Sequence, residues 1–133
     1  PKLRLAFSHG AGGLHCMLQR ANFFWGRTWN EEPSSDGEGL SPAALAKRFY
    51  YDGLVMDRRT LRHLIDMMGH RQVLVGSDFP AMAREQPCAK TLRTLDLPGD
   101  QLDDITWHNT FRFLGVNAPQ LEAAGTASEG VTQ

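Results

Sequence analysis

Three short apolar runs, each followed by a turn and then by a helix-like segment, constrain the fold of this chain more than any other feature. The runs cover residues 3–8, 49–56 and 72–76, and the first is expected to be a buried strand. The third run is almost continuously apolar, which is typical of a parallel strand covered on both faces. Strands that alternate with helices in this way predict a parallel sheet with right-handed crossovers.

The segments between the runs carry helix signals. Residues 14–25 place apolar side chains at helical spacing. Ser41 before Pro42 predicts a helix start, and Asp57 predicts a second one that Gly69 ends. We expect helices over residues 14–25, 41–48, 60–68, 89–95 and 101–114, and a surface loop over residues 30–39.

Composition excludes some classes of function. The 14 basic and 15 acidic residues nearly cancel, which argues against a nucleic-acid or membrane partner held by bulk electrostatics. No apolar run approaches the roughly 20 residues that cross a bilayer. Cys16 and Cys88 fit free thiols in a reducing compartment better than a disulfide bond, which favours a cytoplasmic protein.

Two residues with useful chemistry follow the ends of the apolar runs. His9 follows the first run and Asp78 follows the third. Parallel α/β folds bind ligands at the carboxyl ends of their strands, so we expect these side chains to share a polar pocket. An imidazole and a carboxylate are parts of a metal site or of an acid/base pair. Taken alone, such a histidine is more often structural or incidental, and such an aspartate is more often part of a turn or cap.

Four short motifs occur along the chain, and their order carries a resemblance to a known family. They are Phe-Ser-His-Gly-Ala-Gly at 7–12, Phe-Tyr-Tyr-Asp-Gly-Leu-Val at 49–55, Val-Gly-Ser-Asp-Phe-Pro at 75–80 and Asn-Thr-Phe-Arg-Phe-Leu-Gly at 109–115. Together they resemble the C-terminal part of decarboxylases of the amidohydrolase-related family, within the amidohydrolase superfamily. The resemblance covers roughly residues 3–116. It implies an α/β fold in which residues 1–124 form about three βα units, strands six to eight, of a metal-dependent (β/α)₈ TIM barrel. Residues 125–133 are expected to be a disordered tail.

The resemblance also implies roles for individual residues. Asp78 matches an aspartate that binds the metal, and His9 matches a histidine that acts in catalysis. Arg20 stands where an arginine from the neighbouring subunit contacts the substrate carboxylate, which implies a homodimer. Trp25 and Phe79 are expected to line the substrate pocket. The implied cofactor is a divalent metal, for which Zn²⁺ is the first expectation. Such a metal activates water at neutral pH. A histidine, whose reference pKa is near 6.5, can transfer the proton.

The chain also departs from the family pattern. It has no His-x-His pair, so the remaining metal ligands are expected upstream of residue 1, and Met56 stands where the decarboxylases have histidine. The chain has 133 residues, against roughly 250 for a TIM barrel, and its start at Pro1 favours a fragment or a processed chain. His15 is expected on a helix surface without a role, and Asn109 is expected to fix backbone near the barrel rim.

Three functions remain open at this point. The first is a metal-dependent decarboxylase acting on a small unsaturated or aromatic carboxylic acid. The second keeps the fold and hydrolyses a lactone, an ester or an amide. The third is a catalytically inactive partial barrel, or a module that pairs with another chain, because three βα units leave strand edges unpaired.

Overall fold

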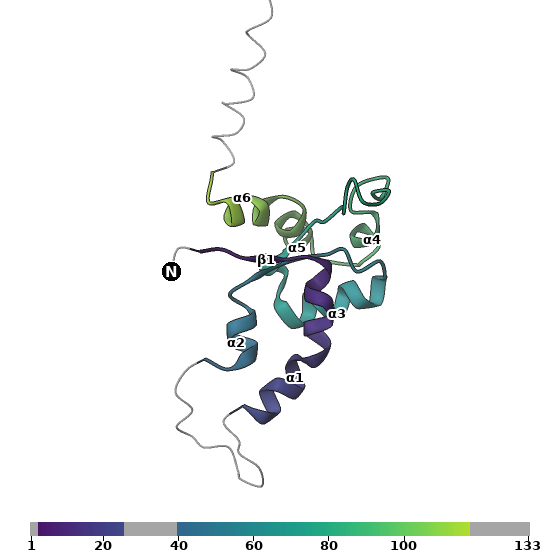
Figure 1. Cartoon of the computed structure of the whole chain (residues 1–133). Coiled ribbons are helices and arrows are strands. Elements are labelled where there is room, and N and C mark those ends of the chain that lie inside the picture. The colour runs from purple at the N-terminus through teal and green to yellow at the C-terminus, as the bar shows by residue number, and fades with distance from the viewer. Residues whose placement is uncertain (1–2, 26–39, 118–133) are drawn as a thin grey trace, which may run out of the picture.

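A computed structural model describes residues 3–25 and 40–117, and its elements alternate as the sequence predicts (Figure 1). The strands are β1 (Ala6–Phe7), β2 (Tyr50–Asp52) and β3 (Val73–Leu74). The helices and helical turns are η1 (His9–Gly13), α1 (Leu14–Phe24), α2 (Pro42–Ala46), α3 (Arg58–Met68), η2 (His70–Gln72), α4 (Lys90–Arg93), α5 (Gly99–Asp103), η3 (Asp104–His108) and α6 (Asn109–Leu114). The loop expected at 30–39 and the tail expected at 125–133 lie outside the described residues.

The three strands form one parallel sheet in the order β1-β2-β3. Ala6 is in register with Tyr50, and Tyr51 is in register with Val73. The prediction of a parallel sheet is therefore confirmed, and all three strands end at the same edge. Figure 1 shows α1, α2 and α3 together on one side of the strands.

The core lies where α3 packs under the sheet. Tyr51, Leu64, Met68 and Val73 are completely buried. The phenol of Tyr51 donates a hydrogen bond of 2.8 Å to the carbonyl of Ala46, so this large side chain is buried without an unpaired hydroxyl. The contact joins β2 to the end of α2.

The predicted helix starts are confirmed by their hydrogen bonds. The Asp57 carboxylate accepts a bond of 2.7 Å from the backbone N–H of Thr60, at the first turn of α3. The Ser41 hydroxyl accepts one of 3.2 Å from the N–H of Ala44, at the start of α2. Gly69 ends α3 with a φ of 95°, a conformation that a residue with a side chain rarely adopts. None of the helices in the described ranges is long and apolar enough to span a membrane.

The first strand is exposed, although the sequence predicts a buried one. Leu3, Leu5 and Phe7 keep 75%, 41% and 42% of their surface exposed. The Leu5 carbonyl accepts a bond from Tyr50 on the β2 side, and within residues 3–25 and 40–117 the other edge of β1 meets no strand. The apolar character of β1 is therefore left without a covering layer in the described structure.

The apolar side chains of α1 are divided between the core and the surface. Leu14, Met17 and Phe24 are exposed, and the buried residues of this helix are His15 and Leu18. The exposed side chains follow one stripe along the helix at spacings of three and seven residues. Exposed stripes of this kind on soluble proteins mark surfaces that another element or chain covers.

The last predicted helix is interrupted. α5 and α6 are separated by the π-helical turn η3, where the sequence predicts one helix over residues 101–114. Ile105 is buried, whereas Leu114 is 53% exposed. A π turn adds a residue to the helical repeat, so the residues after it rotate away from the face that a regular helix predicts.

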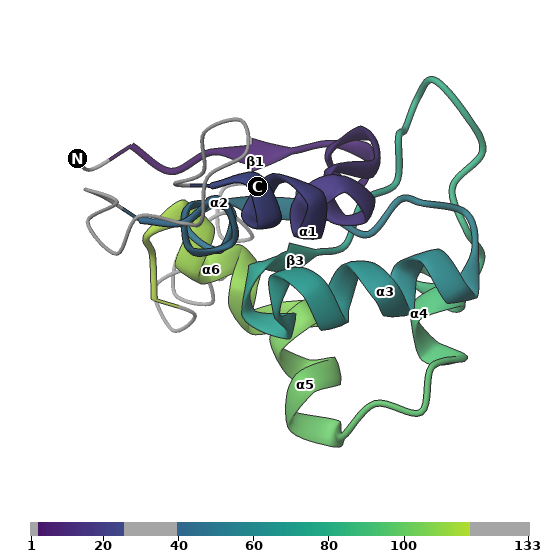
Figure 2. The same ribbon diagram turned by 90° about the horizontal axis from the view of Figure 1, so that it is seen from below.

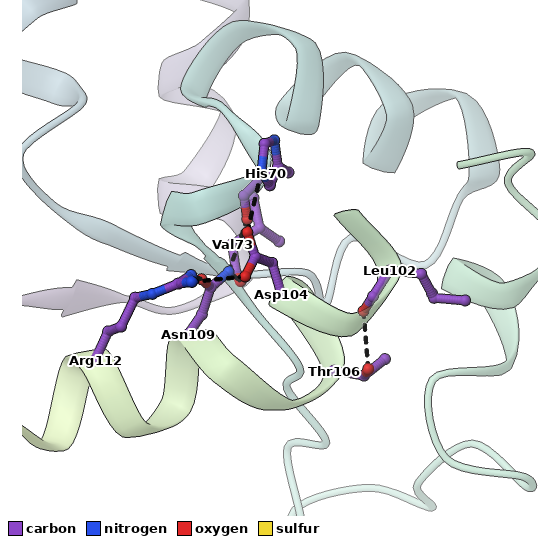
Figure 3. A network of polar contacts seen from close by, with 7 residues as sticks. All are labelled: His70, Val73, Leu102, Asp104, Thr106, Asn109 and Arg112. Carbon is purple, nitrogen blue, oxygen red and sulfur yellow. Dashed lines mark hydrogen bonds and ion pairs between the residues drawn. The ribbon is translucent and has the colours of Figure 1, made fainter. Parts of the chain in front are cut away.

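A polar network fixes this interrupted helix to β3 (Figure 3). The Asn109 amide donates bonds of 2.7 Å to the carbonyls of both His70 and Val73. Arg112 donates to the Asn109 side-chain oxygen at 2.6 Å and to Asp104 at 2.7 Å. His70 Nε2 lies 3.1 Å from the other Asp104 oxygen. Asn109 thus fixes backbone as predicted, but at the start of β3 and not at the edge where the strands end.

The carboxyl group of Asp104 anchors this network. Burial alone would raise its pKa, but the hydrogen bond and charge of Arg112, with the charges of His70 and Arg71, outweigh burial and lower the pKa. Asp104 is therefore ionised at neutral pH, and its two oxygens face Arg112 and His70.

Candidate active site

His9 and Asp78 come together at the edge where the strands end. His9 Nε2 lies 3.8 Å from Asp78 Oδ2, and the two side chains are 57% and 31% exposed. His9 follows β1 and Asp78 follows β3, so the pair reaches across the end of β2, which lies between them. The structure thus unites these two residues as the sequence predicts, while their chemical roles stay predictions.

Each strand is followed by a strained, non-glycine residue. His9, Met56 and Asp78 have φ values of 54°, 56° and 52°, in the left-handed region that favours glycine. Such conformations cost on the order of 1–3 kcal/mol each and cluster at active sites and ligand clamps. The strain at the carboxyl edge supports a functional role for this edge.

The turn η1 positions His9 above α1. Its residues from His9 to Gly13 all have positive φ, and Gly10 is buried beneath His9. A Cβ atom on Gly10 would lie 2.7 Å from Cγ1 of Val55, closer than packed carbon atoms approach. Glycine at position 10 therefore allows both the left-handed backbone and the close approach to the segment after β2.

The pair fits one side of a divalent-metal site. Carboxylate oxygens and imidazole nitrogens are the donors that zinc and manganese sites use. The described residues contain no group of three or more His, Cys, Asp or Glu side chains placed to hold a metal ion. A complete site at this edge therefore needs donors from outside residues 3–25 and 40–117.

Phe79 and Arg84 form a second feature of the same edge. Phe79 follows Asp78 directly and is 67% exposed, which suits its predicted contact with substrate. The guanidinium carbon of Arg84 lies 5.5 Å from the centre of the Phe79 ring, in a cation–π contact. Sequence reasoning assigned nothing to Arg84, because only the folded loop shows that it returns to Phe79.

The other two predicted substrate contacts lie apart from the pair. Arg20 places its guanidinium carbon 5.1 Å from the centre of the Phe24 ring, and Trp25 follows the last residue of α1. A helix rises about 1.5 Å per residue, so Arg20 and Trp25 lie roughly 9 and 16 Å along α1 from Leu14. Within one copy of the chain, the described structure does not bring them to His9 and Asp78.

His15 is buried, which corrects the expectation of a surface histidine. It is only 2% exposed, and neither ring nitrogen forms a hydrogen bond within the described structure. Its ring centre lies 5.3 Å from that of His63 on α3. A usable signal was present, because His15 lies three residues before Leu18 and shares its helix face.

The burial of His15 predicts a loss of stability in mild acid. Burial lowers the pKa of His15, His63 adds to this effect and the Gly10 backbone opposes it. Below pH of about 6.5, His15 is protonated in the unfolded chain but stays neutral in the folded chain until the pH reaches its lowered pKa. The free energy of unfolding therefore falls as the pH drops below about 6.5. Urea unfolding of the chain from pH 8 to 5 should show this fall.

Two variants isolate the contribution of His15. His15→Phe should flatten the profile between about pH 6.5 and the lowered pKa, since phenylalanine does not titrate. His108→Gln, at an exposed position on the last helical segment, should leave the profile unchanged. If the free energy of unfolding changes with pH equally in the wild-type chain and in His15→Phe, then His15 has the same pKa in the folded and unfolded chains, and the prediction is wrong.

Comparison with curated proteins gives two relatives over most of the chain, while no family model matches it. A 2-amino-3-carboxymuconate-6-semialdehyde decarboxylase of Caenorhabditis elegans is 25% identical over 120 residues, covering 88% of this chain and 29% of the relative. The decarboxylase of the same name from Dictyostelium discoideum is 23% identical over 120 residues, covering 88% of this chain and 32% of the relative.

Solved structures agree with this result at the level of the fold. The 5-carboxyvanillate decarboxylase of Sphingomonas paucimobilis superimposes with a TM-score of 0.69 at 21% identity, covering 88% of this chain and 35% of that one. A dihydroxybenzoic acid decarboxylase of a Polaromonas species was solved with manganese and 2-nitroresorcinol. It superimposes with a TM-score of 0.65 at 19% identity, covering 85% of this chain and 34% of that one. The chain resembles the amidohydrolase-superfamily decarboxylases.

The resemblance that the four motifs predict is therefore confirmed. The amidohydrolase-type decarboxylases are TIM barrels, and the described chain has an α/β fold with three parallel strands that is consistent with part of one. The chain spans about a third of the length of the relatives and solved structures that it matches.

Proposed function

We propose that this chain forms strands six to eight of a metal-dependent decarboxylase of the amidohydrolase superfamily. The observation that carries the proposal is the 3.8 Å approach of His9 Nε2 to Asp78 Oδ2 at the carboxyl edge of the sheet. Enzymes with parallel barrels bind substrate at this edge. The strained backbone at His9 and Asp78 supports the same location.

Each residue of the pair has a separate role in this proposal. Asp78 binds a divalent metal, for which Zn²⁺ is our first expectation, although two similar solved structures hold manganese. The metal supplies a Lewis acid that polarises the substrate oxygens. His9 Nε2, which lies 3.8 Å from Asp78 Oδ2, transfers a proton to the carbon that loses its carboxylate.

The proposed substrate is a small aromatic or unsaturated carboxylic acid. Both curated relatives and the similar solved structures described above carry names of decarboxylases, which supports decarboxylation over hydrolysis. Asp78 and Phe79 present a carboxylate and an aromatic face at one point of the edge, an arrangement that suits a planar acid bound to a metal.

The exposed apolar surfaces support a larger assembly. The outer edge of β1 needs a neighbouring strand, which the missing two thirds of the barrel supply in this proposal. The stripe on α1 supports the predicted homodimer, in which Arg20 reaches the site of the other subunit. Cys16 and Cys88 are exposed free thiols, as predicted, and they support the proposed cytoplasmic location.

The test uses the protein purified from its source organism, together with any polypeptide and metal that bind to it there. An affinity tag on this chain in its source organism allows purification of the assembled barrel, whether its other strands lie on the same or another polypeptide. We expect bound divalent metal and metal-dependent release of carbon dioxide from aromatic acids such as 2,6-dihydroxybenzoate. Turnover of lactones or esters alone would favour the hydrolase, and a metal-free, inactive assembly would favour the inactive partial barrel.

A further inference from the structure

A pair of histidines lies where α1 packs against α3, next to the turn that carries His9. His15, in the first turn of α1, is 2% exposed, and its ring centre lies 5.3 Å from that of His63. Neither ring nitrogen of His15 has a hydrogen-bond partner among the described residues. Buried polar groups in proteins are nearly always paired, so this ring is an exception that the roles proposed for His9 and Asp78 do not explain.

The surroundings of His15 offer no counter-charge for a proton. Within residues 3–25 and 40–117, neither His15 nor His63 forms an ion pair. The main neighbours of α1 are η1, α2 and α3, and α2 carries no titratable residue. The titratable residues of the other two are His9 on η1 and Arg58, Arg59, Arg62, His63 and Asp66 on α3. The one carboxylate in this set, that of Asp66, already pairs with Arg62. A buried imidazolium at position 15 would therefore be an unpaired charge, which is strongly unfavourable.

The same part of α3 also supports η1. A Cβ atom on Gly10 would lie 2.7 Å from Cγ1 of Val55 and 3.4 Å from Cδ2 of Leu64, so the backbone of η1 lies directly on these side chains. Leu64 follows His63 in α3. The Gly10 backbone also opposes the effect of burial on the pKa of His15, which places the His15 ring beside η1. Adjacent residues of α3 therefore support both the buried ring and the turn.

We propose that His15 is a positioning residue for His9. Its neutral ring fills the space between η1 and α3, and protonation in mild acid drives the ring out, lifts η1 and separates His9 from Asp78. Histidine suits this use because its charge changes within the physiological range of pH. The inference rests on the proposed function for the role of His9, while the movement itself rests on the contacts of His15.

The start of α1 is the part that yields. All residues of His9–Gly13 have positive φ, a conformation that persists only where the surroundings hold it. Leu14 alone separates this turn from His15, so a displaced ring acts on η1 directly. The other end of α1 is held, because the Asn22 side-chain oxygen accepts a hydrogen bond of 3.0 Å from the N–H of Ala43 at the start of α2. The expected movement is therefore a pivot of α1 about its far end.

Hydrogen exchange followed by mass spectrometry, on the assembled protein from the source organism, tests this movement without requiring turnover. After correction for the intrinsic rate, amides of residues 10–22 should exchange several-fold faster at pH 5.5 than at pH 7.5. The increase should not exceed about tenfold per pH unit below pH 6.5, because the opened form takes up one proton. Amides of α6 should keep their corrected rate. Equal acceleration along the whole chain would show global unfolding and overturn the inference.

Three variants assign the effect to His15. His15→Phe should remove the acid response of residues 10–22, since phenylalanine keeps a ring in the space and does not titrate. His63→Gln, at an exposed position, should make the response smaller because it removes the charge that opposes protonation of His15. This second variant keeps the test decisive if His15→Phe does not assemble. His108→Gln is the matched control, an exposed histidine on η3, and should respond like the wild-type protein. A wild-type response in His15→Phe or in His63→Gln would overturn the inference.

The outcomes separate this inference from the proposed function. If the protein releases carbon dioxide, the wild-type protein should lose a larger fraction of its activity between pH 7 and pH 5.5 than His15→Phe does. A local, His15-dependent acceleration of exchange in a protein that releases no carbon dioxide would preserve the movement and contradict the decarboxylase proposal. An active decarboxylase whose corrected exchange rates do not change with pH would preserve that proposal and overturn the inference.

Discussion

Replacing Asp78 with asparagine is expected to remove the bound metal and to lower kcat/KM for decarboxylation by on the order of a thousandfold. The amide keeps the shape of the carboxylate but lacks the negative charge that attracts a divalent cation. Metal content by mass spectrometry and carbon dioxide release, measured on the same assembled protein, check both parts of this prediction.

His9→Asn separates the roles of the two residues. It should leave the metal bound while lowering the rate by about a hundredfold to ten-thousandfold, the usual contribution of a positioned proton donor. Asp66→Asn is the control, because Asp66 forms an exposed ion pair with Arg62 on α3. Full activity in either Asp78→Asn or His9→Asn would contradict the assignment of that residue.

Asn109→Ala is expected to destabilise the chain by about 3 kcal/mol, since it leaves the backbone carbonyls of His70 and Val73 without this donor and removes one of the two acceptors of Arg112. The Asn109 side chain is completely buried and bonds the carbonyls of His70 and Val73. Urea unfolding of the 133-residue chain measures the effect.

The exposed neighbour Thr110 supplies the control for this experiment. Thr110→Ala should change the free energy of unfolding by no more than about 0.5 kcal/mol, as surface substitutions usually do. A loss below about 1 kcal/mol in Asn109→Ala would mean that the network of Figure 3 does not hold the last helix on β3.

Local signals predicted the order of the elements. Ser41 and Asp57 begin helices as expected because capping depends on a few neighbouring atoms. The burial of β1 was predicted wrongly for a different reason. The apolar pattern of residues 3–8 favours a covered strand, but in the described residues the outer edge of β1 has no neighbouring strand.

The candidate site was predictable to the same degree. His9 and Asp78 follow strands, and parallel strands bring their ends to one edge, so their meeting follows from topology. Arg84 was missed because its environment depends on a contact with Phe79 that no local pattern specifies. The burial of His15 did have a local signal, its place on the same helix face as Leu18. The interrupted last helix was missed because the π turn at η3 depends on tertiary packing that periodicity does not encode.

The central claim is that the two strand ends carrying His9 and Asp78 meet at a metal ion. Anomalous diffraction from crystals of the natively assembled protein, collected at the absorption edge of its metal, locates that ion directly. We expect a peak about 2.0–2.2 Å from an oxygen of Asp78, with the His9 ring beside it. A metal bound elsewhere, with Asp78 facing only solvent or protein, would contradict it.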